Sequence, residues 1–264
     1  QDYEHIIVDD CSSDDSVDII ERYAAEDSRI KFFQNEQNLG DYPNRNEAAS
    51  HASGDYLKYL DADDWIGPYA LQIMLDAMIK FPQAGVGFFD YSMNNRSHLA
   101  KSLSPTQTFQ AHYSGGRNIF GKSPLSAIIK RSAYEEVGRF IPTRQVGDCD
   151  MWHKLCAAYD TVFIPTLLTN YRMHEGQEST LARDNPLIPY SYFDVVIAAI
   201  TGHPGQLESA VVEGLVSGIQ KRKARTIITS IAKHGVLEAN KMRKSSMWSW
   251  PDVIKNAFLK GPVE

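Results

Sequence analysis

The chain has 264 residues, of which 43% are hydrophobic and 23% charged, and its formal net charge is −6 at pH 7. This length and composition predict one large α/β domain, alone or with a helical appendage, and exclude a disordered chain. The three cysteines form no C-x-x-C pair and no stretch is apolar enough to span a membrane. We therefore expect a soluble, cytoplasmic protein without a disulfide framework or a zinc site, and the acidic balance argues against nucleic-acid binding.

Apolar runs alternate with amphipathic stretches through the first 90 residues, in the order typical of a parallel sheet flanked by helices. The predicted strands are Glu4–Val8, Arg29–Gln34, Tyr56–Leu60 and Gly85–Tyr91. The predicted helices are Ser16–Glu26, Asn44–Ser53 and Pro68–Phe81. Residues 92–122 are polar and rich in Gly and Ser, so we expect a long irregular connection there.

Shorter elements follow, and the chain then becomes entirely helical. Strands are predicted near Leu125–Lys130, Thr161–Ile164 and Leu168–Met173, and helices near Ser132–Val137 and Asp150–Tyr159. The later helices are predicted at Leu187–Thr201, Gly205–Ile219, Arg222–Lys233 and Val236–Arg243. We expect an α/β domain over residues 1–185 and a helical region over residues 186–264.

Two clusters of acids stand where predicted strands end. Asp9 and Asp10 end the first strand, and Asp61, Asp63 and Asp64 end the third. Open α/β sheets bind ligands at the carboxyl ends of their strands. The first pair can accept hydrogen bonds from a base or a sugar hydroxyl. The second cluster supplies the oxygen ligands that Mg²⁺ or Mn²⁺ prefers, with solvated turn acids as the alternative.

Six segments, in this order, resemble motifs of the inverting family 2 nucleotide-sugar glycosyltransferases, which have the GT-A fold. They are IIVDDCSSDDS (6–16), QNLGDYPNRNEA (37–48), GDYLKYLDADDW (54–65), EVGRF (136–140), GDCDMW (147–152) and YRMHEGQES (171–179). The resemblance implies a Rossmann-like, mostly parallel sheet flanked by helices. It also implies metal-dependent transfer of a sugar from a nucleotide donor to an acceptor hydroxyl with inversion, in cell-surface polysaccharide or glycolipid synthesis, and we expect the donor to be a UDP-sugar.

The resemblance further implies which residues bind the donor. Asp10, with Asp9 beside it, matches the acid that contacts the uracil of a UDP-sugar. Arg45 and Asn46 match positions near the donor, and Asp61 matches the first acid of a D-x-D motif, which meets the ribose and the metal-bound diphosphate.

The remaining matches concern the metal and the base. Asp63 is implied as the direct ligand of Mn²⁺ or Mg²⁺, with His174 near the metal and the diphosphate. Arg172 could hold a phosphate or face solvent. Asp148 matches the base that deprotonates the acceptor hydroxyl, and its alternative role is to cap the next helix.

Two features depart from the family pattern. The family usually has a strand and a helix before the sequence that resembles residues 1–10, so we expect a sheet without that strand and of low thermal stability. The family often has glutamate where this chain has Gly147, which weakens the assignment of Asp148.

Other function classes remain as alternatives. An apolar strand ending in two acids, followed by a later strand ending in Asp, also resembles a phosphoacceptor receiver module. A nucleotidyltransferase, or a GT-A domain that binds a nucleotide without transferring sugar, would keep the fold. Nucleophile-elbow, Walker A and H-E-x-x-H motifs are absent from the sequence.

The tail has a charge opposite to that of the front. Residues 205–264 hold ten Lys or Arg against five Asp or Glu, whereas residues 1–204 hold 17 against 28. Basic residues here alternate with Met247, Trp248 and Trp250, as in a segment at a membrane interface. We expect either peripheral contact with the inner face of a membrane, where a saccharide or lipid-linked acceptor is presented, or a packed helical region with surface lysines.

Overall fold

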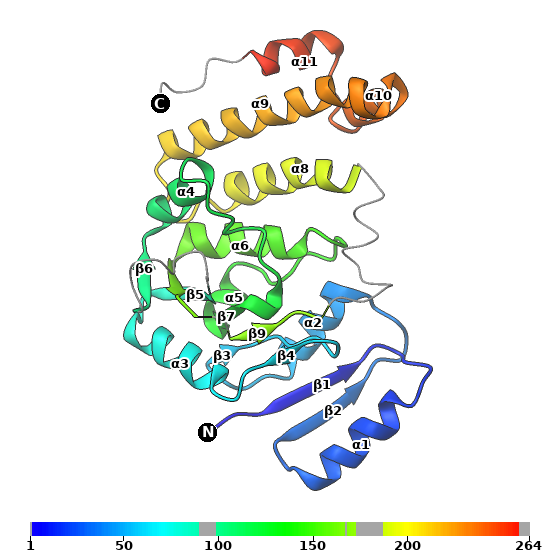
Figure 1. Cartoon of the computed structure of the whole chain (residues 1–264), viewed down its shortest axis with the longest axis vertical. Coiled ribbons are helices and arrows are strands. Elements are labelled where there is room, and N and C mark those ends of the chain that lie inside the picture. The colour runs from blue at the N-terminus through cyan, green and yellow to red at the C-terminus, as the bar shows by residue number, and fades with distance from the viewer. Residues whose placement is uncertain (1, 90–98, 167, 173–186, 259–264) are drawn as a thin grey trace.

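A mixed sheet of five strands forms the centre of the molecule (Figure 1). The computed structural model describes residues 2–89, 99–166, 168–172 and 187–258. The strands, in spatial order, are β3 (Tyr56–Leu57), β7 (Ala127–Lys130), β5 (Ala84–Phe89), β8 (Asp160–Ile164) and β6 (Lys101–Leu103). β5 runs parallel to β8, and the other three neighbouring pairs are antiparallel.

The α/β class is confirmed, but the sheet is not mostly parallel. β6 and β7, which follow β5 along the chain and precede β8, both run against their neighbours. An apolar run predicts a buried strand without predicting its direction, because both directions bury the same side chains. The third predicted strand is also shorter than expected, since β3 ends at Leu57 and the chain from Lys58 to Asp64 leaves the sheet.

The first two strands form a separate parallel pair. β1 (His5–Asp9) lies beside β2 (Ile30–Gln34), and α1 (Ser16–Glu26) connects them. Among the described residues, β1 has no strand on its other side. A second short pair joins β4 (Trp65–Ile66) to β9 (Thr169–Asn170), and this pairing brings Arg172 close to the second acid cluster.

Helices cover both faces of the central sheet. They are α2 (Asp41–Ser50), α3 (Ala70–Lys80), α4 (Pro105–Tyr113), α5 (Arg131–Glu136) and α6 (Gly147–Ala158). On β8, Phe163 belongs to the core beneath α6, whereas its neighbour Val162 belongs to the core beneath α3. Trp152 of α6 is fully buried and packs edge to face on Phe88 of β5, with ring centroids 5.1 Å apart.

Residues 92–122 are not the irregular connection that their composition predicts. The described part of this segment contains β6 and α4, which begins with a capping box in which Ser104 and Gln107 bond each other's backbone N–H. The sequence Ser-Pro-x-Gln is typical of such a capping box, but the polar residues around it favour the prediction of a loop. The described part of this segment therefore adds an edge strand to the sheet and a helix that packs on α6 and β8.

The described residues of the tail form four helices, stacked at the C-terminal end of the molecule (Figure 1). They are α8 (Leu187–Gly202), α9 (Ser209–His234), α10 (Val236–Ser245) and α11 (Trp250–Ala257). The two helices predicted across Gly205–Lys233 form one helix, α9, because the polar residues between them continue the helical turns. α11 was missed, although Ser249 and Asp252 form a capping box at its start.

The helical region has a core of its own and also packs on the α/β part. Lys223 is only 2% exposed, forms an ion pair with Asp194, and lies 5.3 Å and 5.0 Å from the rings of Tyr190 and Trp248. Trp248 therefore packs inside this region. α8 lies against α6, and the boundary at residue 185 stays a prediction. No helix within the described ranges combines the length and apolar character required to cross a membrane.

Candidate active site

Asp10 fixes the loop that leads from β2 into α2. Its Oδ1 accepts hydrogen bonds from the backbone N–H of Leu39 and the amide of Asn35, both at 2.8 Å. Its Oδ2 accepts the N–H of Gly40 at 2.9 Å, directly before α2. A carboxylate can accept about four hydrogen bonds, so Asp10 retains capacity for a ligand.

Asp9 is buried and holds the turn between β1 and α1. Its Oδ2 accepts the N–H groups of Cys11 and Ser12 at 3.1 Å and 3.0 Å, and the Gln34 amide at 3.2 Å. Burial raises the pKa of Asp9, but these hydrogen bonds lower it more, so the net shift is downward. Asp9 is thus an ionised turn residue beside Asp10, and its contacts are all with the protein.

Arg45 on α2 connects the first acid of the D-x-D motif to the helix. Its Nη2 lies 2.6 Å from Oδ1 of Asp61, and its Nη1 pairs with Asp41 one turn earlier. The guanidinium also lies 5.6 Å from the ring of Tyr42. Its Nε is buried and has no hydrogen-bond partner among the described residues. The guanidinium is thus held between two carboxylates while its buried Nε–H lacks a hydrogen bond.

Asp64, the third acid of the cluster, is only 5% exposed. Its Oδ1 accepts the backbone N–H of Arg172 at 3.0 Å, and its Oδ2 is buried without a partner in the described part of the chain. Burial raises the pKa of Asp64, and the charges of Asp63 and Asp61 raise it further. Three carboxylates are thus close enough to repel one another, which a bound cation would relieve.

Asp148 lies in the first turn of α6. The N-cap is Val146, so Asp148 does not cap the helix, and its Oδ1 accepts the N–H of Cys149 at 2.7 Å. Burial raises the pKa of Asp148, while the Cys149 N–H, a hydrogen bond from the Tyr42 hydroxyl and the charge of Arg45 partly offset this. Asp148 is thus a more basic carboxylate than an exposed one.

Gly147 lets Tyr42 reach Asp148. A Cβ on Gly147 would lie 2.7 Å from ring atoms of Tyr42, so no larger residue fits without moving that ring. Tyr42 is 4% exposed and packs on Phe140 at 5.2 Å. The glycine that departs from the family pattern therefore has a structural reason. The contribution of Tyr42 was not predicted, since α2 is joined to α6 only through the fold.

Comparison with known proteins places these residues in a family. The family model described as glycosyl transferase family 2 matches residues 1–138, which is more than half of the chain. The chain belongs to this family. The receiver module is therefore set aside as an alternative.

Relatives and solved structures agree with this assignment. The uncharacterized glycosyltransferase MJ1057 of Methanocaldococcus jannaschii is 29% identical over 200 residues, covering 71% of this chain and 66% of the relative. The putative teichuronic acid biosynthesis glycosyltransferase TuaG of Bacillus subtilis is 37% identical over 107 residues, covering 40% of each. The chain thus spans less than two thirds of either relative.

The solved structures show the fold. The crystal structure of S. aureus TarS 1-349 in complex with UDP-GlcNAc superimposes with a TM-score of 0.72, at 19% identity, over 96% of this chain and 72% of that one. This supports the GT-A architecture of the glycosyltransferase.

Asn46 and His174 are the remaining predicted site residues. The Asn46 amide donates to the carbonyl of Phe140 at 2.8 Å, and its Oδ1 accepts the Tyr134 hydroxyl at 2.5 Å and the Phe140 N–H at 3.2 Å. In this member of the family Asn46 thus positions the EVGRF turn. His174 lies outside the described residues.

Lys58 is a charged group near the acids that the sequence analysis missed. Its Nζ donates to the carbonyls of Leu125 and Tyr59 at 2.5 Å and 2.6 Å. Burial lowers the pKa of Lys58 to about 7, against the charges of Asp61 and Asp64, which raise it. A lysine inside the apolar run YLKYL is the signal that could have pointed to it.

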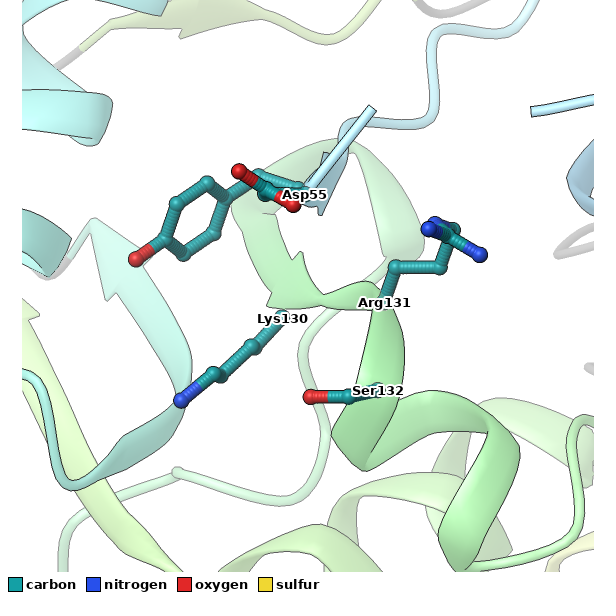
Figure 2. A pocket seen from close by; sticks show the side chains of 5 residues that line it. Asp55, Lys130, Arg131 and Ser132 are labelled. Carbon is teal, nitrogen blue, oxygen red and sulfur yellow. The ribbon is translucent and has the colours of Figure 1, made fainter. Parts of the chain in front are cut away.

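A pocket of about 230 Å³ lies away from these acids (Figure 2). It is lined by Asp55, Tyr56, Lys130, Arg131 and Ser132, and Arg131 donates to the carbonyl of Gly54 at 2.7 Å. These residues surround the start of β3, whereas the acid cluster follows its end. The pocket is therefore not part of the candidate active site.

Proposed function

We propose that the chain transfers a sugar from a UDP-linked donor to an acceptor hydroxyl with inversion, using Asp148 as the base. The observation that carries this proposal is the position of Arg45. It bonds Asp61 in the D-x-D motif, and its charge acts on Asp148. A leaving-group site bonded to a guanidinium, and a base that feels the charge of the same guanidinium, form the minimal arrangement for direct displacement at a sugar carbon.

The reaction needs one proton acceptor. Asp148 takes the proton of the acceptor hydroxyl as its oxygen attacks the anomeric carbon. The bond between that carbon and the diphosphate oxygen breaks, and its electron pair leaves with UDP. Because burial raises the pKa of Asp148, the carboxylate accepts this proton more readily than an exposed aspartate.

The acids of the D-x-D motif fit a divalent cation. Asp63 and Asp61 offer carboxylate oxygens beside the unpartnered Oδ2 of Asp64, and Mn²⁺ and Mg²⁺ prefer such ligands. Within the described ranges no three His, Cys, Asp or Glu side chains could hold a metal alone, so donor phosphates would complete the site. Such an ion would neutralise charge developing on the leaving diphosphate.

The donor and the pathway are inferred from relatives. UDP is the nucleotide part of the donor bound in the TarS structure, and TuaG is named for teichuronic acid biosynthesis. We assign Asp10 to the base of the nucleotide, with Asp9 beside it, and Arg45 and Arg172 to the phosphates. The acceptor is then a saccharide or lipid-linked saccharide of a cell-surface polymer or glycolipid.

Calorimetric titration with UDP tests the donor site. We expect UDP to bind the chain only with Mn²⁺ or Mg²⁺, and Asp63→Ala to abolish this binding. Asp76→Ala, the same change on an exposed position of α3, is the matched control and should bind normally. Equal binding by Asp63→Ala would remove the metal assignment. Tight UDP binding without release of UDP from any UDP-sugar would favour the nucleotide-binding alternative.

The tail is the second part of the proposal, as a peripheral contact with anionic membrane lipid. Among its described residues, Val236, Leu237, Met247 and Phe258 are 62%, 80%, 92% and 77% exposed, and the tail carries an excess of Lys and Arg. Trp248, by contrast, is partly buried and packs against the core of the helical region. Vesicle co-sedimentation should be stronger with anionic than with neutral lipid, and equal binding would refute the contact.

A further inference from the structure

A pocket of about 230 Å³ opens between the α/β part and the helical tail. We call it the junction pocket. Its walls are mainly aromatic and come from both parts: His112, Tyr113 and Phe120 from α4 and the segment after it, and Tyr192 and Phe193 from α8. Pockets for drug-sized ligands are larger, at roughly 300–1,000 Å³, so the junction pocket fits a ligand of about one ring.

The junction pocket lies next to the proposed base. Cys149, the residue that follows Asp148 on α6, forms part of its lining. Tyr192 also lines it, and its hydroxyl donates to the carbonyl of Gln145 at 2.5 Å, on the segment that leads to Asp148. Burial raises the pKa of Tyr192 to about 12, and the charge of Asp148 adds to this shift. The pocket therefore shares Cys149 and Tyr192 with the surroundings of Asp148, although Asp148 itself is not among its lining residues.

The floor of the junction pocket is held by buried hydrogen bonds. The Nδ1–H of His153 donates to the carbonyl of Cys149 at 2.7 Å, so its Nε2 accepts the hydroxyl of Tyr113 at 2.8 Å. His153 is 1% exposed, and its ring lies 3.9 Å from that of Phe120. The pocket is thus preformed, which lowers the entropic cost of binding.

The lining of the junction pocket also includes hydrogen-bond donors. Nδ1 of His112 accepts the N–H of Ile119 at 3.2 Å, and burial lowers the pKa of His112 to about 4, so the neutral ring carries its proton on Nε2. Arg222 of α9 is exposed, lies 5.5 Å from the Tyr113 ring, and uses Nη2 for the Tyr113 carbonyl at 3.3 Å. A guanidinium carries five N–H donors, so Arg222 has donors beyond this one hydrogen bond that a ligand could use.

We propose that the junction pocket binds a neutral saccharide unit of the acceptor, which packs its ring on the aromatic side chains and brings a hydroxyl to Asp148. Sugar rings combine apolar C–H faces with hydroxyls at their edges, which matches aromatic walls with a few donors. This inference locates the binding site of the saccharide acceptor in the proposed reaction and rests on that reaction. It also gives the helical tail a direct part in substrate selection.

Saturation-transfer NMR on the full chain tests the pocket without a donor. The probes are the methyl β-glycosides of glucose, galactose and their N-acetylamino forms, together with octyl β-D-glucoside below its micelle concentration. Val196→Trp fills the pocket from α8. Arg222→Ala removes an exposed donor at no risk to the core, and Arg225→Ala removes the same charge from α9 outside the pocket.

We expect saturation transfer to the sugar-ring protons of the glycosides, and we expect Val196→Trp to abolish it. Arg222→Ala should raise the dissociation constant about tenfold, which corresponds to a loss of ~1.4 kcal/mol in binding free energy. Arg225→Ala should leave the dissociation constant unchanged. Transfer to the octyl chain alone would overturn the proposal in favour of a lipid. No transfer to any glycoside, or transfer unchanged in both pocket variants, would also overturn it. UDP titration of the same variants is expected to match the unaltered chain, so failure of the donor site is seen separately.

Discussion

Two helices of nearly equal length show how differently the halves of the candidate site are supported. α1, with 11 residues, has no buried residue, and Ile19 and Tyr23 are 46% and 52% exposed. α6, with 12 residues, buries ten, including Trp152. The proposed donor side is therefore held mainly by hydrogen bonds that Asp9 and Asp10 accept, whereas the proposed base is held by a packed core. We therefore expect substitutions on the donor side to change donor binding, and substitutions on α6 to change stability and turnover.

Replacing the acid of each half should give opposite kinetic results. Asp148→Asn removes the base, so we expect sugar transfer to fall about 10²–10⁴-fold with UDP binding unchanged. Asp10→Asn loosens the loop at Gly40 and should weaken UDP binding instead. UDP release from a panel of UDP-sugars, together with calorimetry, measures both. If Asp148→Asn lost UDP binding as well, the two halves would not be functionally distinct.

Stability should depend far more on α6 than on α1. Trp152→Ala removes a fully buried indole that packs on Phe88 and donates to the carbonyl of Lys122 at 2.6 Å. We expect it to lower the free energy of unfolding by about 3–5 kcal/mol. Ile19→Ala, on the exposed face of α1, should change it by less than ~0.5 kcal/mol. Urea unfolding followed by circular dichroism gives both values, and similar losses would refute the contrast.

The sequence was most informative where short-range patterns decide structure. The bounds of α1 were predicted as observed, and those of β1 and β2 within one residue, because apolar runs ending in acids or turn residues are local signals. The same signals put Asp10 at the end of a strand and Asp61 beyond another. Family resemblance supplied the role of Asp148, which its own sequence context does not distinguish from a helix cap.

What the sequence could not show depends on contacts between distant segments. Strand direction is set by the path of the chain, so the antiparallel β6 and β7 were not foreseen. Tyr42 lies more than 100 residues from Gly147, and no periodicity links a ring in α2 to a glycine in α6. The junction pocket likewise combines four helices. These features surround the candidate base and the proposed acceptor site, whereas the features that the sequence predicts surround the proposed donor site.

Low pH should destabilise the fold through the buried histidines of α4 and α6. Burial lowers the pKa of His153 to about 3 and that of His112 to about 4, from an ordinary 6.5. The unfolded chain therefore binds protons that the folded chain does not bind. The contribution of the neutral histidines to the free energy of unfolding is complete above pH 6.5 and is lost as the pH falls below that value. The slope is about 1.4 kcal/mol per pH unit for each histidine that stays neutral.

Urea unfolding across this pH range measures the slope. His153→Gln should flatten it, and His234→Gln, at the exposed end of α9, should not. The raised pKa values of Asp148 and Asp150 act in the opposite direction at the acid end of the range. A free energy of unfolding that does not decrease between pH 6.5 and about pH 5 would contradict the burial of neutral histidines.

The contact between α2 and α6 is where the two halves meet, and Gly147→Ala tests it. The added Cβ would lie 2.7 Å from the Tyr42 ring, which must then move and draw its hydroxyl from Asp148. We expect a stability loss of about 1–3 kcal/mol and slower transfer. Gly218→Ala on α9 is the matched control, because its Cβ meets no atom within 4 Å and alanine favours the helix by about 0.5–1 kcal/mol.

Tyr42→Phe separates the hydroxyl from the ring in the same contact. The ring still packs on Gly147 and Phe140, so stability should change less than in Gly147→Ala. The hydroxyl lowers the pKa of Asp148, so its removal should raise that pKa and move the acidic limb of the pH–rate profile to higher pH. An unmoved limb with slower transfer would mean that Tyr42 acts only through packing. A moved limb would show that α2, which carries Arg45, also tunes the base on α6.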